Sequence, residues 1–260
     1  APHMQGTATR AVCATLNPTA TTFKKEEPEA IRYLVIAENE QRKEGEKKLY
    51  LMFDQIYWAL TFGDTKHYNP VALRPKMKEY TVFIDGISKA FAATGVRVGW
   101  AMGPEELIVK MRSLNSHIGS WAPMAEQHAV ARFLKNDHEV QSFLGHFKSE
   151  VDIRLRKIYE GFQQLKKDGF PVDAIIPQAA IYLTVQINLV GKKTAEGQVL
   201  KEQPDATAYL LSEAKLALVP FSAFGAGKDN NWYRISVGCC KKEEIGTMFS
   251  KLREALAKLG

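Results

Sequence analysis

Three short apolar runs most constrain the fold of this chain. They span residues 49–53, 81–84 and 98–102, and each ends at Asp or Gly. Unbroken apolar runs of this length are typical of strands buried on both faces, as in parallel sheets. Helical patterns lie beside them, over residues 22–38 and directly after Pro104. Strands that alternate with helices predict an α/β layer with a largely parallel sheet.

The second half of the chain opens with one long amphipathic stretch. Apolar residues recur every three or four positions from Val140 to Leu165, and Gly169 follows as a suitable helix cap. The pattern predicts a helix over residues 137–168, about 45 Å long at about 1.5 Å per residue. Beyond it, strands are predicted at 181–187, 216–219 and 233–237, and helices near 205–214 and 243–259. Together they predict a small α+β domain.

Charge and cysteine content exclude several classes of protein. The 35 Lys and Arg exceed the 29 Asp and Glu, but the basic runs are interleaved with Glu, unlike a nucleic-acid-binding patch. Three cysteines cannot build a disulfide framework, and no apolar stretch approaches the length of a membrane span. We therefore expect a cytoplasmic protein. The histidines show no metal-ligand spacing, so no metal site is expected.

The segment that follows the second apolar run carries the clearest chemistry. Lys89 lies among small and apolar residues, including Ile87 and Phe91, and Arg97 follows eight positions later. A lone lysine is usually a solvated surface group. Here the apolar neighbours are expected to desolvate the side chain, which favours the uncharged amine that forms Schiff bases.

This segment resembles the pyridoxal-phosphate lysine signature of class I/II aminotransferases, Ser-Lys-x-x-x-x-Thr-Gly-x-Arg-x-Gly. The resemblance implies that Lys89 forms the Schiff base and then moves the α-proton as general base. It also implies that Arg97 holds the cofactor phosphate through paired N–H donors. Part of the family has a phosphate-binding Ser three positions before the lysine, but this chain has Gly86 there, so that role is not transferred.

Three further motifs are similar to those of the same family. Asp54-Gln55-Ile56-Tyr57 is close to Asp-Glu-x-Tyr, which implies that Asp54 keeps the pyridine nitrogen protonated and that Tyr57 hydrogen-bonds the phenolic oxygen. Taken alone, Asp54 could cap a turn and Tyr57 could be a core residue.

The other two motifs lie near the two ends of the chain. Asn17-Pro18-Thr19-Ala20 is similar to Asn-Pro-Thr-Gly, whose Asn also binds the phenolic oxygen; a positive φ at Ala20 would cost about 1 kcal/mol. The segment Asn231-Trp232-Tyr233-Arg234-Ile235-Ser236 resembles the family's C-terminal pattern. This resemblance implies that Arg234 pairs bidentately with the substrate α-carboxylate.

The resemblance covers nearly the whole chain and implies an aspartate aminotransferase-like protein of fold type I. Its match begins in the middle of the family's large domain. We therefore expect a partial cofactor-binding large domain over residues 1–136, the long interdomain helix over 137–168 and a small domain over 169–260.

The implied activity is pyridoxal-phosphate-dependent transamination between an amino acid and a 2-oxo acid by a homodimer, with an aspartate or aromatic substrate. The resemblance does not include the family's glycine-rich phosphate-binding loop or the aromatic residue that stacks on the cofactor ring. We therefore expect this chain to be poorly active alone. The alternative is a catalytically silent remnant that acts as an oligomerisation or interaction module.

Overall fold

The computed structural model describes residues 9–13, 15–227 and 229–260. The chain divides into two compact units. The first contains the described residues up to Leu16 together with Thr22–Phe147, and the second contains Asn17–Thr21 together with Lys148–Gly260. One division therefore falls inside a long helix, and a five-residue segment near the start of the chain belongs to the second unit.

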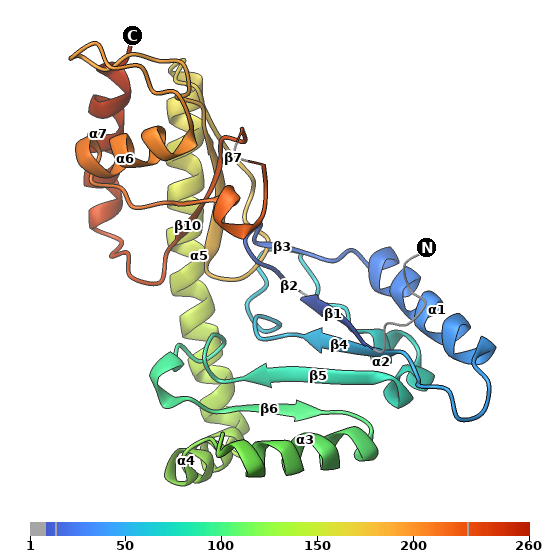
Figure 1. The fold of residues 1–260 in the computed structure, drawn as a ribbon. Coiled ribbons are helices and arrows are strands. Elements are labelled where there is room, and N and C mark those ends of the chain that lie inside the picture. The colour runs from blue at the N-terminus through green and yellow to red at the C-terminus, as the bar shows by residue number, and fades with distance from the viewer. Residues whose placement is uncertain (1–8, 14, 228) are drawn as a thin grey trace. The chain divides into compact units, whose positions relative to one another are not determined.

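The first unit is built on a four-stranded sheet with the order β1-β4-β5-β6 (Figure 1). Its strands are β1 (Thr9–Cys13), β4 (Tyr50–Asp54), β5 (Thr81–Gly86) and β6 (Gly99–Met102). β1, β4 and β5 run parallel, whereas β6 is antiparallel to β5. The expected α/β layer with a largely parallel sheet is thus confirmed.

Helices and short turns connect these strands. They are α1 (Glu26–Gln41), α2 (Pro70–Leu73), η1 (Pro75–Glu79), η2 (Thr94–Val96), α3 (Glu105–Ile118) and α4 (Met124–Leu134). The two-residue strands β2 (Thr15–Leu16) and β3 (Thr21–Thr22) flank the turn at residues 17–20. The helix predicted from residue 22 begins at Glu26, because the chain is still extended at β3.

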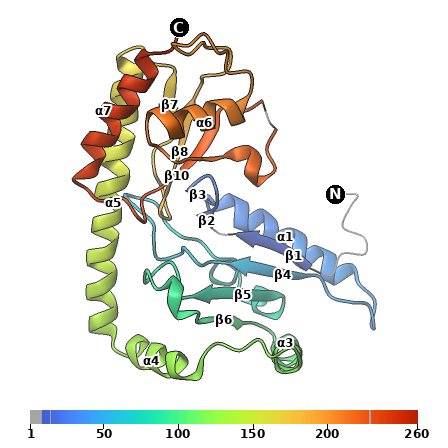
Figure 2. The same ribbon diagram turned by 60° about the vertical axis from the view of Figure 1, so that its left-hand side comes forward.

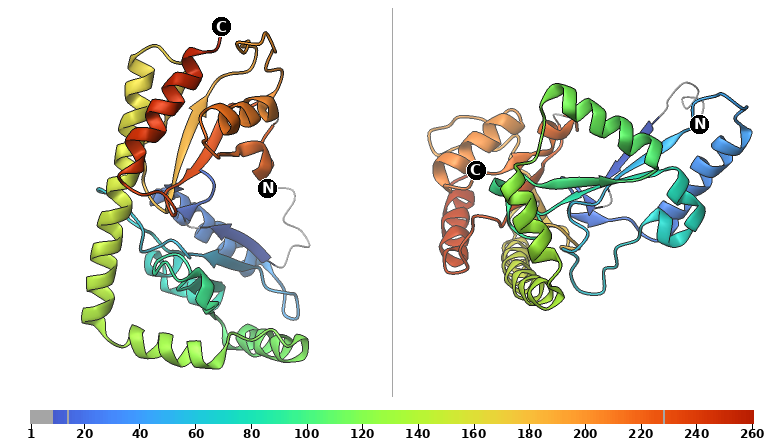
Figure 3. Two further views of the ribbon diagram at one scale, coloured as in Figure 1. Left: turned by 90° about the vertical axis from the view of Figure 1, so that its left-hand side faces the viewer. Right: turned by 90° about the horizontal axis from the view of Figure 1, so that it is seen from below.

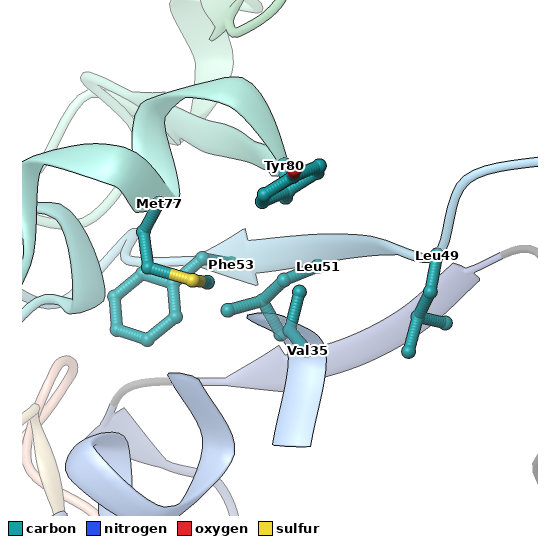
Figure 4. Packing of buried hydrophobic residues seen from close by; sticks show 6 residues of the cluster. All are labelled: Val35, Leu49, Leu51, Phe53, Met77 and Tyr80. Atoms are coloured by element: carbon teal, nitrogen blue, oxygen red, sulfur yellow. The ribbon is translucent and has the colours of Figure 1, made fainter. Parts of the chain in front are cut away.

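The main core of this unit packs α1 and η1 against β4. Figure 4 shows its buried members, Val35, Leu49, Leu51, Phe53, Met77 and Tyr80. The Asn39 side chain of α1 accepts a hydrogen bond from the Leu49 N–H at 2.8 Å and donates one to the Leu49 carbonyl at 2.9 Å. These two bonds satisfy the backbone N–H and C=O groups of Leu49 and fix the start of β4.

The prediction that the apolar runs are buried on both faces is wrong for β4 and β6. Leu51 and Phe53 face the core, but Met52 between them is 37% exposed. Alternate side chains of a strand point to opposite faces, so Met52 lies on the more open one. In β6, Met102 is 50% exposed, and none of the four residues is buried.

The second unit has an antiparallel sheet with the order β7-β8-β10-β9 (Figure 2). Its elements are α5 (Asp137–Lys167), β7 (Val172–Ala174), β8 (Tyr182–Ile187), α6 (Gln203–Glu213), β9 (Val219–Pro220), η3 (Phe221–Phe224), β10 (Trp232–Ser236) and α7 (Glu244–Ala257). Gly169 follows α5 with φ +88°, the left-handed conformation that ends a helix. Within the described residues, no helix is long and apolar enough to cross a bilayer.

Helices α5 and α7 lie side by side (Figure 3). Gly161 of α5 permits their close approach, since a Cβ there would lie 2.3 Å from the Phe249 ring of α7. That ring is itself held edge-on against Phe162, with the centroids 5.4 Å apart. A side chain at position 161 would therefore force this ring to shift and would disturb its contact with Phe162.

We expect Gly161→Ala to lower the free energy of unfolding by about 1–3 kcal/mol, because the added methyl group overpacks this contact. The matched control is Gly145→Ala on the same helix, where nothing lies within 4 Å of the new Cβ. It should raise the free energy of unfolding by about 0.5–1 kcal/mol through the better helix propensity of Ala. Urea unfolding followed by circular dichroism measures both, and equal effects of the two changes would contradict the packing argument.

Candidate active site

Asp54 and Lys89 lie at the same edge of the first unit's sheet. β4 and β5 are adjacent and parallel, so their carboxyl ends meet at one edge. Asp54 is the last residue of β4, and Lys89 lies three residues beyond Gly86, the last residue of β5. In open α/β sheets, ligands bind outside the carboxyl ends of the strands.

The Asp54 carboxylate is only partly committed to local structure. Its Oδ1 accepts a hydrogen bond from the Ile56 N–H at 3.0 Å, so the residue does cap a turn. Its Oδ2 makes no hydrogen bond within the described part of the chain, which leaves one oxygen for a ligand. Tyr57 is 4% exposed, so its ring is also part of the core.

Lys89 is more accessible than the sequence predicted. Ile87 and Ala90 are buried, but Ile87 packs with Val98 and Val130, and Phe91 lies against that cluster. The apolar neighbours therefore anchor the loop and leave Lys89 half-buried. Its ammonium group forms no ion pair or side-chain hydrogen bond with the residues that the structure describes.

Arg97 ends the same loop in a left-handed conformation, with φ +61°. Its side chain is exposed, and Nη1 donates to the Thr94 carbonyl oxygen at 2.7 Å. The Thr-Gly-x-Arg part of the motif thus closes on itself and holds one terminal nitrogen of the guanidinium. Its remaining N–H groups make no hydrogen bond to other described residues and stay open to an anion.

The structure explains why residue 86 is glycine, which the motif alone does not reveal. A Cβ at this position would lie 2.9 Å from the Val98 carbonyl oxygen and 3.0 Å from the Gly99 Cα. Both are backbone atoms of the chain leading into β6. No side chain fits there, so the serine found in part of the family is excluded by the close approach of the two strands.

A buried carboxylate beside this site was missed by the sequence reasoning. Asp85 is 7% exposed; its Oδ1 accepts from the Gly86 N–H at 2.7 Å, and its Oδ2 accepts from the Gln55 amide at 3.4 Å. Burial raises the pKa of the Asp85 carboxyl, and these hydrogen bonds, with one from Trp58, partly oppose the shift. The sequence signal that could have revealed Asp85 is Gln55, which stands where the family motif Asp-Glu-x-Tyr has Glu. A Glu at this position would place a second carboxylate against Asp85, whereas the Gln55 amide donates a hydrogen bond to it.

Asn17 and Arg234 meet in the second unit. Arg234 of β10 lies opposite Thr184 of β8, and its Nη1 donates to the Asn17 Oδ1 at 2.7 Å. The segment around Asn17 is fixed to this sheet, because the Thr184 hydroxyl donates to the Thr19 carbonyl oxygen at 2.8 Å. Ala20 has φ +59°, the positive value considered from the sequence.

Comparison with known proteins identifies the family of this chain. A family model described as aminotransferase class I and II matches residues 11–252. The chain belongs to this family.

Curated aminotransferases match most of the chain. The chain is 32% identical over 211 residues to the aspartate aminotransferase of Geobacillus stearothermophilus, covering 81% of this chain and 48% of that protein. It is 30% identical over 228 residues to the probable aspartate/prephenate aminotransferase of Rhizobium leguminosarum bv. phaseoli, covering 87% and 52%. The chain thus spans about half the length of the curated relatives that it matches.

Solved aminotransferase structures share the fold. Aspartate aminotransferase from Rhizobium meliloti superposes with a TM-score of 0.80 at 24% identity, covering 97% of this chain and 59% of that one. A double mutant of the Thermus thermophilus aspartate aminotransferase gives 0.79 at 25% identity, covering 96% and 57%. The fold is that of the fold type I aminotransferases.

The residues present in the first unit fit the cofactor of such aminotransferases, pyridoxal phosphate. An uncommitted primary amine at Lys89 suits an aldehyde, and the free N–H groups of Arg97 suit a phosphate. The open oxygen of Asp54 suits a protonated ring nitrogen.

Proposed function

We propose that this chain is part of a pyridoxal-phosphate-dependent aminotransferase that transfers an amino group between an amino acid and a 2-oxo acid. The observation that carries the proposal is Lys89, an uncommitted amine beside the end of β5, at the same sheet edge as Asp54. The relatives named above as aspartate and aspartate/prephenate aminotransferases support an amino acid as substrate.

When bound, pyridoxal phosphate supplies an electron sink that acidifies the substrate Cα–H. Lys89 would hold the cofactor through Nζ and later, as a free amine, take the proton from Cα. Asp54 would keep the ring nitrogen protonated, which maintains the electron sink. Arg97 would hold the phosphate, and Tyr57 and Asn17 would donate to the phenolic oxygen.

Arg234 would bind the substrate α-carboxylate. Its Nη1 is engaged by Asn17, and its Nε is buried without a hydrogen-bond partner. A guanidinium matches a carboxylate through two parallel N–H donors. This role is common to all amino acids, so it supports transamination in general and leaves selectivity to other residues.

Association with a second copy is part of the proposal. None of the residues of α3 is buried, and Val109, Leu114 and Ile118 are 48%, 62% and 71% exposed. Exposed apolar side chains on one helix are typical of a surface that is covered in an assembly. The same surface supports the alternative function, a catalytically silent module that acts by association.

The test mixes the purified chain with pyridoxal phosphate, L-aspartate and 2-oxoglutarate and measures glutamate. We expect cofactor-dependent glutamate formation far below the roughly 10 s⁻¹ of a typical enzyme, because displacement of a held group by about 1 Å already costs about a hundredfold. A rate of about 10 s⁻¹ would contradict the expected poor activity. No glutamate and no cofactor binding would favour the silent module.

A further inference from the structure

Arg234 is fixed in the second unit by groups that carry no charge. Its Nη1 donates to the Asn17 amide oxygen at 2.7 Å, and its guanidinium carbon lies over two rings, 4.3 Å from the Tyr182 centroid and 4.8 Å from that of Phe224. Across the described residues, no carboxylate lies within ion-pair distance of it. The guanidinium therefore keeps its whole charge for an incoming anion.

The two rings come from a strand and from a short turn. Tyr182 lies on the central strand β8, two residues from Thr184, the residue opposite Arg234, so Tyr182 and Arg234 share one face of the sheet. Phe224 is the last residue of the short turn η3, which ends at Gly225 with φ +89°. Phe224 is 40% exposed and packs edge-on against Phe221, with the centroids 6.4 Å apart.

An acidic partner would hold Arg234 at least as firmly, but it would also neutralise the charge that a carboxylate ligand requires. An aromatic ring restrains the guanidinium plane and displaces water from it while leaving its charge intact. Water displaced from one side of the group strengthens the attraction of an anion that binds at its free edge.

We propose that Asn17, Tyr182 and Phe224 form a neutral clamp that orients Arg234 without neutralising it, with Phe224 as the positioning residue that sets carboxylate affinity. The inference rests on the proposed function of Arg234 as the carboxylate-binding residue. It adds that the affinity of Arg234 for a carboxylate depends on the Phe224 ring, which contacts the guanidinium and not the carboxylate.

The experiment titrates the ¹⁵N-labelled chain with maleate and follows the Nε–Hε signal of Arg234, which is assigned by its loss in Arg234→Lys. Phe224→Leu should raise the Kd for maleate about three- to tenfold, and Phe224→Tyr should restore it because the ring is retained. Phe170→Leu is the matched control. It removes a ring of the same unit that lies over another arginine, Arg253, with the guanidinium carbon 5.5 Å from the ring centroid, and the Kd should change less than about twofold.

A second variant tests the same clamp without altering a ring. Asn17→Asp keeps the acceptor oxygen for Nη1 but adds a negative charge, so maleate should bind more weakly than to the wild type. Maleate binding by Asn17→Asp as tight as the wild type, or an unchanged Kd in folded Phe224→Leu, would overturn the clamp alone. No shift of the Arg234 signal in the wild type would instead refute the proposed carboxylate-binding role.

Discussion

Lys89→Ala should abolish site-specific covalent capture of pyridoxal phosphate by this chain. The Lys89 amine is uncommitted in the described structure and lies at the same sheet edge as Asp54. Without it the aldehyde of the cofactor loses the amine that follows the carboxyl end of β5. Reduction with borohydride fixes any adduct, and digestion followed by mass spectrometry then assigns it to a peptide.

The matched control is Lys66→Ala, which removes an exposed lysine of the same unit. It should leave the adduct on the Lys89 peptide unchanged. Exposed lysines also react slowly with aldehydes, so the comparison is made at the lowest cofactor concentration that labels the wild type. Labelling of the Lys66 peptide in preference to the Lys89 peptide would remove the basis of the proposed function.

Gly86→Ala should give the largest loss of stability among single methyl additions in the first unit, about 3 kcal/mol. The new Cβ would lie 2.9 Å from the Val98 carbonyl oxygen and 3.0 Å from the Gly99 Cα, and backbone atoms in a paired strand cannot yield as a flexible side chain can. The strain falls three residues before Lys89, so the lysine loop should shift as well.

Gly95→Ala is the control for this change, because it lies in the same loop with nothing within 4 Å of the added Cβ and no positive φ. Its free energy of unfolding should stay within about 0.5 kcal/mol of the wild type. Urea unfolding gives both values. Gly86→Ser with wild-type stability would show that the strands can separate to accept the side chain that part of the family carries.

Elements with a strong period could be predicted from the sequence. The stretch that forms α5 repeats apolar residues at helical spacing over many turns, and the structure has a helix over Asp137–Lys167 where the pattern indicated 137–168. In contrast, α4 and β7 were not predicted. β7 has only three residues, too few to establish a period, and it exists through pairing with β8.

Burial and long-range contacts could not be predicted in the same way. The run that forms β4 is apolar throughout, yet the exposure of Met52 depends on what covers each face of the sheet. The bond between Asn17 and Arg234 joins residues 217 positions apart, and no local pattern encodes such a pairing. Each motif was found separately, whereas the pairing of Asn17 with Arg234 inside the second unit required the fold.

The five-residue segment Asn17–Thr21 has a consequence for the order in which the chain folds. Its hydrogen-bond partners Thr184 and Arg234 follow Thr19 and Asn17 by 165 and 217 positions, so they are synthesised much later than the segment itself. Closing so long a loop is entropically costly and slow, and the second unit completes this sheet face only after the strand that carries Arg234 has left the ribosome. A piece beginning at Lys148 would contain all four strands of that sheet but would leave the Arg234 guanidinium and the Thr184 hydroxyl without these acceptors.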